Sequence, residues 1–538
     1  MLSPVSTVAR NPQRVAGLAG LASALPRYLR RPLRLEGAVE AVAERLRTRT
    51  ERFLQLAEQA VYGYEPSIYR RLLLHAGCEM ADLLSSVRRD GLEATLARLR
   101  AEGVHLTLEE FKGLKPVCRG AATFESDDDA LANPLLRGTQ WRAKSSGTRH
   151  PGTTVGYTWE LFEEEAQEEC ILFAEHGIEE SLLAYWMPGP PGIAGIHNLL
   201  LDLKCGRSPR RWFSQVPLSA AAARDKLALL FVGGCTAVAG RRMAFPRLTP
   251  MDRASVVARW MSRRPNERAP RVLKAYASSA VRMAQAAKAD GIDLGGQFVF
   301  TGGEPLTEAR YRFLVSSGLR VHPRYVATEA GLIGAGCGRS DRHDRMHVYV
   351  DRLAVIQAPS PAAAATVPES SFLFTSLSPH APRILLNTEL GDAGHLTEQP
   401  CECAFGKLGM STFVSHVASP DKLTGEGMTV LGSELNEVIA GLVCELGGSP
   451  DDVQFWESPD HEGLSRVIIA VSPRAGAFDE SAFKERIVTR LRERGGAGSL
   501  TAQVWEQART LQVVRADPEP TAGHKILPIT RRPDSSVT

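Results

Sequence analysis

The sequence predicts a multidomain α/β protein, and three observations lead to this fold class. The chain has 538 residues, more than the roughly 250–300 over which a single hydrophobic core grows. From about residue 140 to about residue 410, short β-rich runs alternate with helical patterns and glycine turns, which is typical of α/β architecture. Beyond about residue 419 a shorter pattern of helices and strands follows, and it indicates a small α+β domain.

Composition excludes several other classes of protein. Hydrophobic residues make up 43% of the chain and charged residues 23%, as in ordinary globular proteins. The 64 Lys and Arg side chains against 61 Asp and Glu leave a formal net charge of +3, which argues against a general nucleic-acid binder. No apolar run approaches the roughly 18 residues of a membrane span. The nine scattered cysteines indicate reduced thiols in a cytoplasmic protein, with metal binding as the exception to test.

We expect three parts: an N-terminal arm (1–37), a large domain (38–418) and a C-terminal domain (419–538). The arm is basic, since no acidic residue precedes Glu36. Its stretch Val15–Ala24 superficially matches a signal peptide, but we favour a basic, partly helical arm. Apolar residues recur near helical spacing from about residue 38 to about residue 103, which predicts helices there.

Local signals within the large domain predict particular elements. Thr249-Pro250 is typical of a helix start, an N-cap followed by a first-turn proline. A further helix is expected over about Arg271–Ala289. Phe298–Phe300 is expected as a strand, and the Ala- and Pro-rich stretch Ala358–Pro368 as a loop.

The C-terminal domain is expected to begin at a boundary near Ser419–Lys422. Its pattern predicts, in order, a helix at Ser433–Leu446, a strand at Ser465–Val471, a helix at Ser481–Arg494 and strands near Ala502–Val514. We find no internal repeat in the chain.

The strongest chemical feature is the stretch Ser145–Thr154, which precedes an acid-rich stretch expected as a helix, Glu160–Glu169. Small hydroxyl side chains and glycine allow backbone N–H groups to turn around an anion. Arg149 adds a charge that suits phosphate oxygens. The Gly-Lys-Ser/Thr ending of a Walker loop is missing. A polar turn without a ligand is the alternative interpretation.

Four further motifs follow along the chain. Tyr325–Glu329 combines an aromatic ring, a hydroxyl and a carboxylate, groups that suit stacking on a purine and holding a metal ion. Asn387–Asp392 places in a turn a carboxylate that suits a ribose diol, Thr301–Leu306 follows an expected strand, and Gly523–Ile526 contains a lysine. Taken singly, each has a plainer explanation as a strand-end turn or a solvated lysine.

The order and spacing of these five motifs, over residues 145–525, resemble the adenylate-forming acid ligases: acyl- and aryl-CoA synthetases, peptide-synthetase adenylation domains and luciferases. The phenylacetate-CoA ligase-like branch is the most similar, since Leu108–Gly113 and Arg119-Gly120 resemble it as well. The resemblance covers the chain beyond about the first 35 residues. It implies a large N-terminal adenylation domain with stacked sheets and a small, mobile C-terminal lid domain.

The resemblance also implies roles for single residues. The loop that cradles the ATP phosphates matches Ser145, Ser146, Gly147, Thr148 and Arg149. The adenine- and ribose-binding positions match Gly303, Glu304, Pro305, Tyr325 and Asp392, with Arg383 close by. The catalytic positions match Thr328 for a phosphate contact, Glu329 for the Mg²⁺ ligand and Lys525 for the lysine that reaches the carboxylate and the α-phosphate. Asp421 or Lys422 falls at the family's hinge.

The chain departs from the family pattern at several positions. Arg149-His150-Pro151 stands where the phosphate loop usually continues Thr-Gly-Lys-Pro, and Val326 replaces the glycine after the stacking tyrosine. The Gly-Arg that usually precedes the hinge is absent from His416–Pro420, and Leu385–Asn387 lacks the usual tyrosine. These departures concern the second half-reaction most, so the acceptor stays open between coenzyme A, a carrier-protein thiol and an amine.

A metal site is the remaining sequence feature. Cys401 and Cys403, with Cys337 and His347 upstream, form a Cys3His set that suits structural zinc. Relatives in the branch show a similar arrangement, and the match of Met346–Asp351 to a family element favours His347 over His343. Unligated buried thiols are the alternative.

We therefore predict an ATP- and Mg²⁺-dependent acid ligase that adenylates a small-molecule carboxylic acid, aromatic or hydrophobic, and transfers the acyl group to coenzyme A. Trp186, Trp212-Phe213 and Phe231 would line the acyl slot or lie in the core, and His197 would meet a polar substituent or be structural. Nucleotidyl transfer to a hydroxyl and a non-catalytic nucleotide-binding scaffold are the rival functions. The oligomeric state is left open, with a homodimer among the options.

Overall fold

The structure is a computed structural model that describes residues 24–136, 141–144, 154–190, 192–262, 268–359, 370–419, 422–449, 452–459, 464–494, 496–519 and 529–531. The described part has α/β architecture, as predicted. No helix in it combines the length and the apolar character that crossing a membrane requires.

The chain begins with a helical layer. Residues 24–30 are helical, and the next elements are α2 (Leu35–Arg47), α3 (Arg49–Leu56), a π-helical turn (Ala57–Tyr62), α4 (Ile68–His75), α5 (Met80–Asp90), α6 (Leu92–Ala101) and the short α7 (Leu108–Phe111). This confirms the helices predicted up to residue 103. Thr107 and Glu110 form a reciprocal capping box at the start of α7, which fixes the segment that carries Lys112.

The centre of the molecule is a 12-stranded sheet with the order β13-β14-β15-β16-β12-β11-β10-β9-β8-β5-β6-β7. Its strands are β5 (Leu182–Trp186), β6 (Arg211–Ser214), β7 (Pro246–Leu248), β8 (Arg271–Ala275), β9 (Phe298–Thr301), β10 (Arg320–Ala327), β11 (Gly331–Ala335), β12 (Met346–Val348), β13 (Leu353–Pro359), β14 (Ser370–Ser376), β15 (Thr388–Glu398) and β16 (Thr412–Ala418). Two short hairpins stand apart: β1 (Val117–Arg119) with β2 (Ala122–Phe124), and β3 (Trp141–Lys144) with β4 (Thr154–Tyr157).

Strand β10 joins the two halves of this sheet. Its first half pairs in parallel with β9, and its second half pairs antiparallel with β11. The register of the β10–β11 pair shifts between Tyr325 and Val326, as at a β-bulge, which bends a strand and re-aims its side chains. The predicted Tyr325–Glu329 motif therefore lies where the parallel half meets the antiparallel half.

The helices that follow the helical layer are α8 (Trp159–Glu175), α9 (Ala194–Lys204), α10 (Ala223–Val238), α11 (Ala254–Met261), α12 (Ala277–Ala289), α13 (Glu308–Ser316) and α14 (Ala404–Lys407). Helix α8 contains the acid-rich stretch predicted as a helix. Its side chains are buried on almost every side, including four glutamates, Glu164, Glu165, Glu168 and Glu169. Acids in such a place require internal partners.

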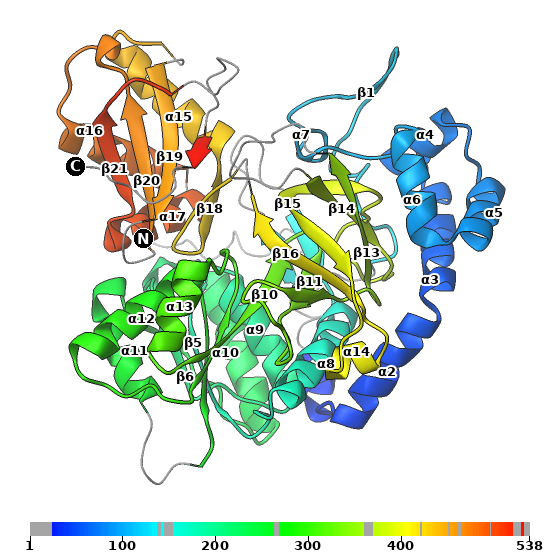
Figure 1. Ribbon diagram of the computed structural model, residues 1–538, viewed down its shortest axis with the longest axis horizontal. Coiled ribbons are helices and arrows are strands. Elements are labelled where there is room, and N and C mark those ends of the chain that lie inside the picture. The colour runs from blue at the N-terminus through cyan, green and yellow to red at the C-terminus, as the bar shows by residue number, and fades with distance from the viewer. Residues whose placement is uncertain are drawn as a thin grey trace, which may run out of the picture.

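A C-terminal unit follows residue 422. It comprises β17 (Lys422–Gly425), β18 (Met428–Leu431), α15 (Gly432–Glu445), β19 (Val453–Pro459), β20 (Ser465–Val471), α16 (Glu480–Glu493), α17 (Gly496–Ala508), β21 (Leu511–Arg515) and β22 (Ile529–Arg531). Four strands form a sheet of order β21-β20-β19-β22, and β17 pairs with β18. Figure 1 shows this unit, in orange and red, beside the green helices α11–α13, with the blue N-terminal helices on the opposite side of the molecule.

Several sequence predictions of elements need correction. The Asn387–Asp392 motif, predicted as a turn, lies from Thr388 onward in strand β15, and the predicted loop Ala358–Pro368 begins within β13. The helix predicted over Arg271–Ala289 is strand β8 followed by α12, because Arg271 and Lys274 lie buried among internal partners and do not mark a solvent face. The strands predicted near Ala502–Val514 are helix α17 and β21, and Ala502, Trp505 and Ala508 repeat every three residues on the buried face of that helix. Pro250 precedes a 3₁₀ turn, so α11 begins only at Ala254.

Candidate functional site

The predicted site residues divide into two groups. Gly303, Glu304, Pro305, Tyr325, Thr328, Glu329, Arg383 and Asp392, together with the predicted metal ligands, belong to the described part of the chain. Ser145, Ser146, Gly147, Thr148, Arg149, Asp421 and Lys525 lie outside the described residues, and their roles remain predictions.

Tyr325 and Asp392 meet although 67 residues separate them. The Tyr325 hydroxyl donates to Asp392 Oδ2 at 2.7 Å, and the Ser419 hydroxyl donates to Oδ1 at 2.5 Å. Burial raises the pKa of Tyr325 well above its usual range, and the Asp392 carboxylate adds to the effect. The ring of Tyr325 meets Phe374 edge to face, with centroids 6.2 Å apart. The fold thus brings Tyr325, predicted to pack on adenine, into contact with Asp392, predicted to bind ribose.

Glu329, the predicted magnesium ligand, has a cationic partner. Its buried carboxylate forms an ion pair with the Lys112 ammonium, whose side chain is also mostly buried. The carbonyl of the neighbouring Thr328 accepts a hydrogen bond from the Tyr157 hydroxyl at 2.8 Å. Sequence reasoning gave Lys112 no role. The only signal was its place in the Leu108–Gly113 stretch that resembles the ligase branch.

The turn Gly303–Pro305 is fixed by its own glutamate. The Glu304 carboxylate accepts hydrogen bonds from the Ser278 N–H at 2.8 Å and from the Gly427 N–H of the C-terminal unit. Arg310 lies 3.5 Å from this carboxylate and donates to the Pro305 carbonyl at 3.0 Å. The side chain of Glu304 therefore holds α12 and the C-terminal unit against the turn.

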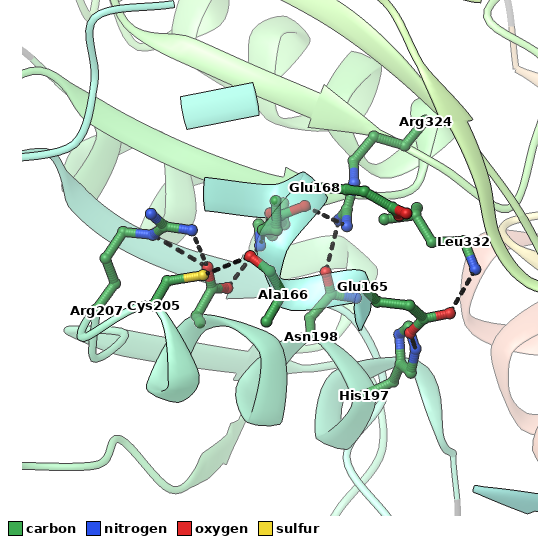
Figure 2. Close-up of polar contacts among 12 residues, drawn as sticks. Glu165, Ala166, Glu168, His197, Asn198, Cys205, Arg207, Arg324 and Leu332 are labelled. Carbon is green, nitrogen blue, oxygen red and sulfur yellow. Dashed lines mark hydrogen bonds and ion pairs between the residues drawn. The ribbon is translucent and has the colours of Figure 1, made fainter. Parts of the chain in front are cut away.

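Helix α8 contacts the β10–β11 hairpin through its buried acids (Figure 2). Glu165 accepts from the Leu332 N–H at 2.7 Å and contacts His197 at 2.6 Å, and Arg324 reaches both Glu169 and Asn198. At Glu169 burial favours the neutral acid, yet Arg324 and Lys274 outweigh it and lower the pKa to about 2. His197 is thus a buried structural partner of Glu165, which is the second of the two interpretations given above.

Replacing Arg324 by methionine should lower the free energy of unfolding by about 3–5 kcal/mol, because it leaves buried polar groups of Glu169 and Asn198 without their partner. Urea unfolding measures the change. The matched control is Arg47→Met, whose exposed ion pair with Glu44 is worth at most about 1 kcal/mol. Similar losses in the two variants would contradict the positioning role of the α8 network.

The remaining predicted site residues take other places. Arg383 is buried and donates to the backbone carbonyl and the carboxylate of Asp128, both at 2.8 Å. Trp186 and Trp212 are buried in the core and donate to the carbonyls of Thr249 and Met187. These two rings therefore belong to the hydrophobic core, which is the alternative to lining the acyl slot.

The predicted metal ligands converge. The ligand atoms of Cys337, His347, Cys401 and Cys403 all lie within 4.8 Å of one another. Cys403 Sγ is 3.1 Å from His347 Nε2, and Cys337 Sγ is 3.9 Å from Cys401 Sγ. Zn–S bonds of about 2.3 Å in a tetrahedron place sulfurs about 3.8 Å apart, so the set fits zinc. His343, the competing ligand, instead contacts Glu308 at 2.6 Å.

No protein-family model and no curated protein matches the chain. Among solved structures it is similar to a 2-hydroxyisobutyryl-CoA ligase in complex with 2-HIB-AMP and CoA in the thioesterification state, at 14% identity, with 94% of this chain and 91% of that chain covered and a TM-score of 0.55. It also matches an o-succinylbenzoate CoA synthetase from Bacillus subtilis, at 12% identity, with 72% and 68% covered and a TM-score of 0.41. The chain has the fold of the adenylate-forming acyl-CoA and AMP-acid ligases.

Proposed function

We propose that the protein joins a carboxylic acid to coenzyme A at the expense of ATP. A carboxylate oxygen attacks the α-phosphorus, pyrophosphate leaves, and the thiol then attacks the acyl carbonyl and releases AMP. The observation that carries the proposal is the contact between Tyr325 and Asp392. Tyr325 lies in β10, the first strand of the hairpin whose loop carries Glu329. A purine platform, a ribose acceptor and a metal-binding carboxylate are the groups that binding of magnesium-ATP needs.

Electrostatics supports the chemistry of the first step. The carboxylate and the triphosphate are both anions, so cations must offset their repulsion and the charge that develops at phosphorus. Lys112 lies next to Glu329. Arg149, which precedes Glu329 in the sequence, and Lys525, which follows it, would supply further positive charge. Mg²⁺ held by Glu329 would neutralise phosphate charge. Zinc on the Cys3His cluster would be structural, because its four ligands leave no position open.

Acid-dependent exchange of pyrophosphate into ATP tests the proposal. Pools of aryl and aliphatic acids, each with magnesium, identify the acid class, with aromatic or hydrophobic acids expected to support exchange. Adding coenzyme A, a carrier protein or amines to the active pool then identifies the acceptor. No exchange with any acid, from a folded protein that binds ATP, would contradict the proposal and favour nucleotidyl transfer to a hydroxyl or a scaffold.

Asp392→Asn should raise the KM for ATP about tenfold or more, because an amide accepts hydrogen bonds from a ribose diol more weakly than a carboxylate. The kcat should change less, since the ribose takes no part in bond making. The control is Asp128→Asn, an exposed carboxylate that binds Arg383. Steady-state kinetics in the active acid pool decides: equal KM values for Asp392→Asn and the parent protein would contradict the assignment to ribose.

A further inference from the structure

Helix α10 turns an apolar face outward. Between Leu227 and Val238 the helix contains no charged residue. Three of its residues are buried on the opposite side: Leu229, Val232 and Thr236. On the outer side Leu227, Leu230 and Val238 are 62%, 59% and 85% exposed. A helix that is hydrophobic on all sides is normally buried, so this outer side has the character of a contact surface.

The three outer side chains of α10 are also the most exposed large apolar groups in the described part of the chain, where no other exceeds 46%. Phe245 extends them, because a Cβ atom on Gly233 of α10 would lie 2.6 Å from its ring. A Cβ atom on Gly234 would have no neighbour within 4 Å, so the helix is open to solvent there. Leu227, Leu230, Gly234, Val238 and Phe245 are together called the α10 face. Single exposed apolar residues are ordinary, but a group of them marks an interaction site.

Basic side chains accompany the α10 face. Residues 210–247 contain seven Lys and Arg side chains against one acid, a formal charge of +6, whereas the whole chain has +3. The one acid, Asp225, pairs with Arg224 at 3.2 Å. Arg224, Arg242 and Arg247 are exposed. The face therefore suits a partner that carries negative charge.

The N-terminal helical segment adds positive charge at the end of α10. Arg241, three residues past the helix, donates to the Leu29 carbonyl at 3.2 Å and to the Leu203 carbonyl. Arg30 and Arg31, which follow Leu29, are exposed. Two segments that are far apart in the sequence thus bring arginines to the same end of α10.

Charge and apolar character together select the partner. A second copy joined through this face by a two-fold axis would place the same arginines against one another. A nucleic acid would pair with the arginines but offers no apolar surface to the leucines. An anionic membrane meets both needs, since its headgroups attract basic side chains and its acyl boundary accepts apolar ones. We propose that the α10 face binds an anionic lipid surface.

The arginine-rich end of α10 lies away from the candidate nucleotide site. Strands β5 to β9 pair in parallel, so their amino ends lie at one edge of the sheet. Val238 and Phe245 come before the amino end of β7, whereas Gly303 follows the carboxyl end of β9. Vesicle binding can therefore be measured separately from catalysis, and the proposal does not rest on the proposed function.

Co-sedimentation of the full chain with lipid vesicles tests the α10 face. The two probes are vesicles of equal parts phosphatidylglycerol and phosphatidylcholine, and vesicles of phosphatidylcholine alone. The protein should partition onto the anionic vesicles at least about tenfold more strongly, and the preference should decrease as salt is added. Absence of binding to the anionic vesicles, or equal binding to both kinds, would overturn the proposal.

The double variant Leu227→Gln/Leu230→Gln should lower partition onto the anionic vesicles at least about tenfold, because it removes the apolar area that enters the bilayer. Both side chains are exposed, so the fold should be kept. The matched control is Val256→Gln/Val315→Gln, which changes exposed valines of α11 and α13 and should leave partition unchanged. Equal losses in the two double variants would contradict the assignment to α10.

Sedimentation velocity of the same proteins without lipid tests for a second copy on the face. The parent protein and Leu227→Gln/Leu230→Gln should show the same oligomeric state. A parent dimer that this double variant dissociates, in a protein that does not bind anionic vesicles, would assign the face to a second copy and overturn the proposal.

Discussion

Lys525→Ala is expected to lower acid-dependent pyrophosphate exchange about 10²–10³-fold, the usual effect of removing one donor that stabilises developing charge. The resemblance assigns Lys525 to the reacting carboxylate and the α-phosphate. In that role its charge would offset the repulsion of the two anions that meet in adenylate formation. The transfer step starts from an adenylate in which that bond already exists, so transfer from preformed acyl-adenylate should be largely kept.

Two measurements on the same preparation separate these steps. Pyrophosphate exchange reports adenylation, and release of AMP from synthetic acyl-adenylate plus coenzyme A reports transfer. Lys288→Ala, which removes an exposed lysine at the end of α12, controls for loss of positive charge and should affect neither. Comparable losses of both steps in Lys525→Ala would show that the lysine supports the fold or a shared step.

Cys403→Ser is expected to remove bound zinc and to lower the thermal midpoint by roughly 5 °C or more. The four ligand atoms lie within 4.8 Å of one another, and structural zinc contributes about 10–16 kcal/mol in small zinc-finger peptides. The cluster joins Cys337, just beyond β11, and His347, within β12, to the segment before α14. Its loss should therefore loosen the strands next to the β10–β11 hairpin.

Metal analysis of the purified protein and a thermal melt provide the readings. About one zinc per chain is expected in the parent protein and none in the variant. Cys235→Ser, a partly buried thiol outside the cluster, should keep both the metal and the midpoint. A parent protein that holds no zinc after growth in zinc-replete medium would favour the alternative of unligated thiols.

The single helix predicted over Arg271–Ala289 was wrong for a reason that lies outside the local sequence. Arg271 and Lys274, charged residues within the strand that opens this stretch, are both buried. Lys274 forms ion pairs with Glu169 and Asp202, partners that are far away in the chain. Hydrophobic periodicity reports which face meets water, and it misleads when a charged residue finds its partner inside the protein.

The sequence by itself determined the motifs whose chemistry depends on residues adjacent in the chain. The Cys-x-Cys pair, the Tyr325–Glu329 run and the Asn387–Asp392 run could be recognised because each depends on neighbours in the chain, although Thr388–Asp392 lies in strand β15 and not in a turn. The choice of His347 over His343 came from the resemblance, and the structure agrees with it. The α/β class followed from alternating periodicities that local sequence carries.

Only the tertiary structure decided which distant groups meet. Lys112 reaches Glu329 over 217 positions, and Arg282 reaches Glu426 over 144. Pairings of this kind depend on sheet order, on the bulge in β10 and on the approach of the C-terminal unit, none of which leaves a periodic trace in the chain. Burial then gives each pairing its strength, since charges removed from water must find one another.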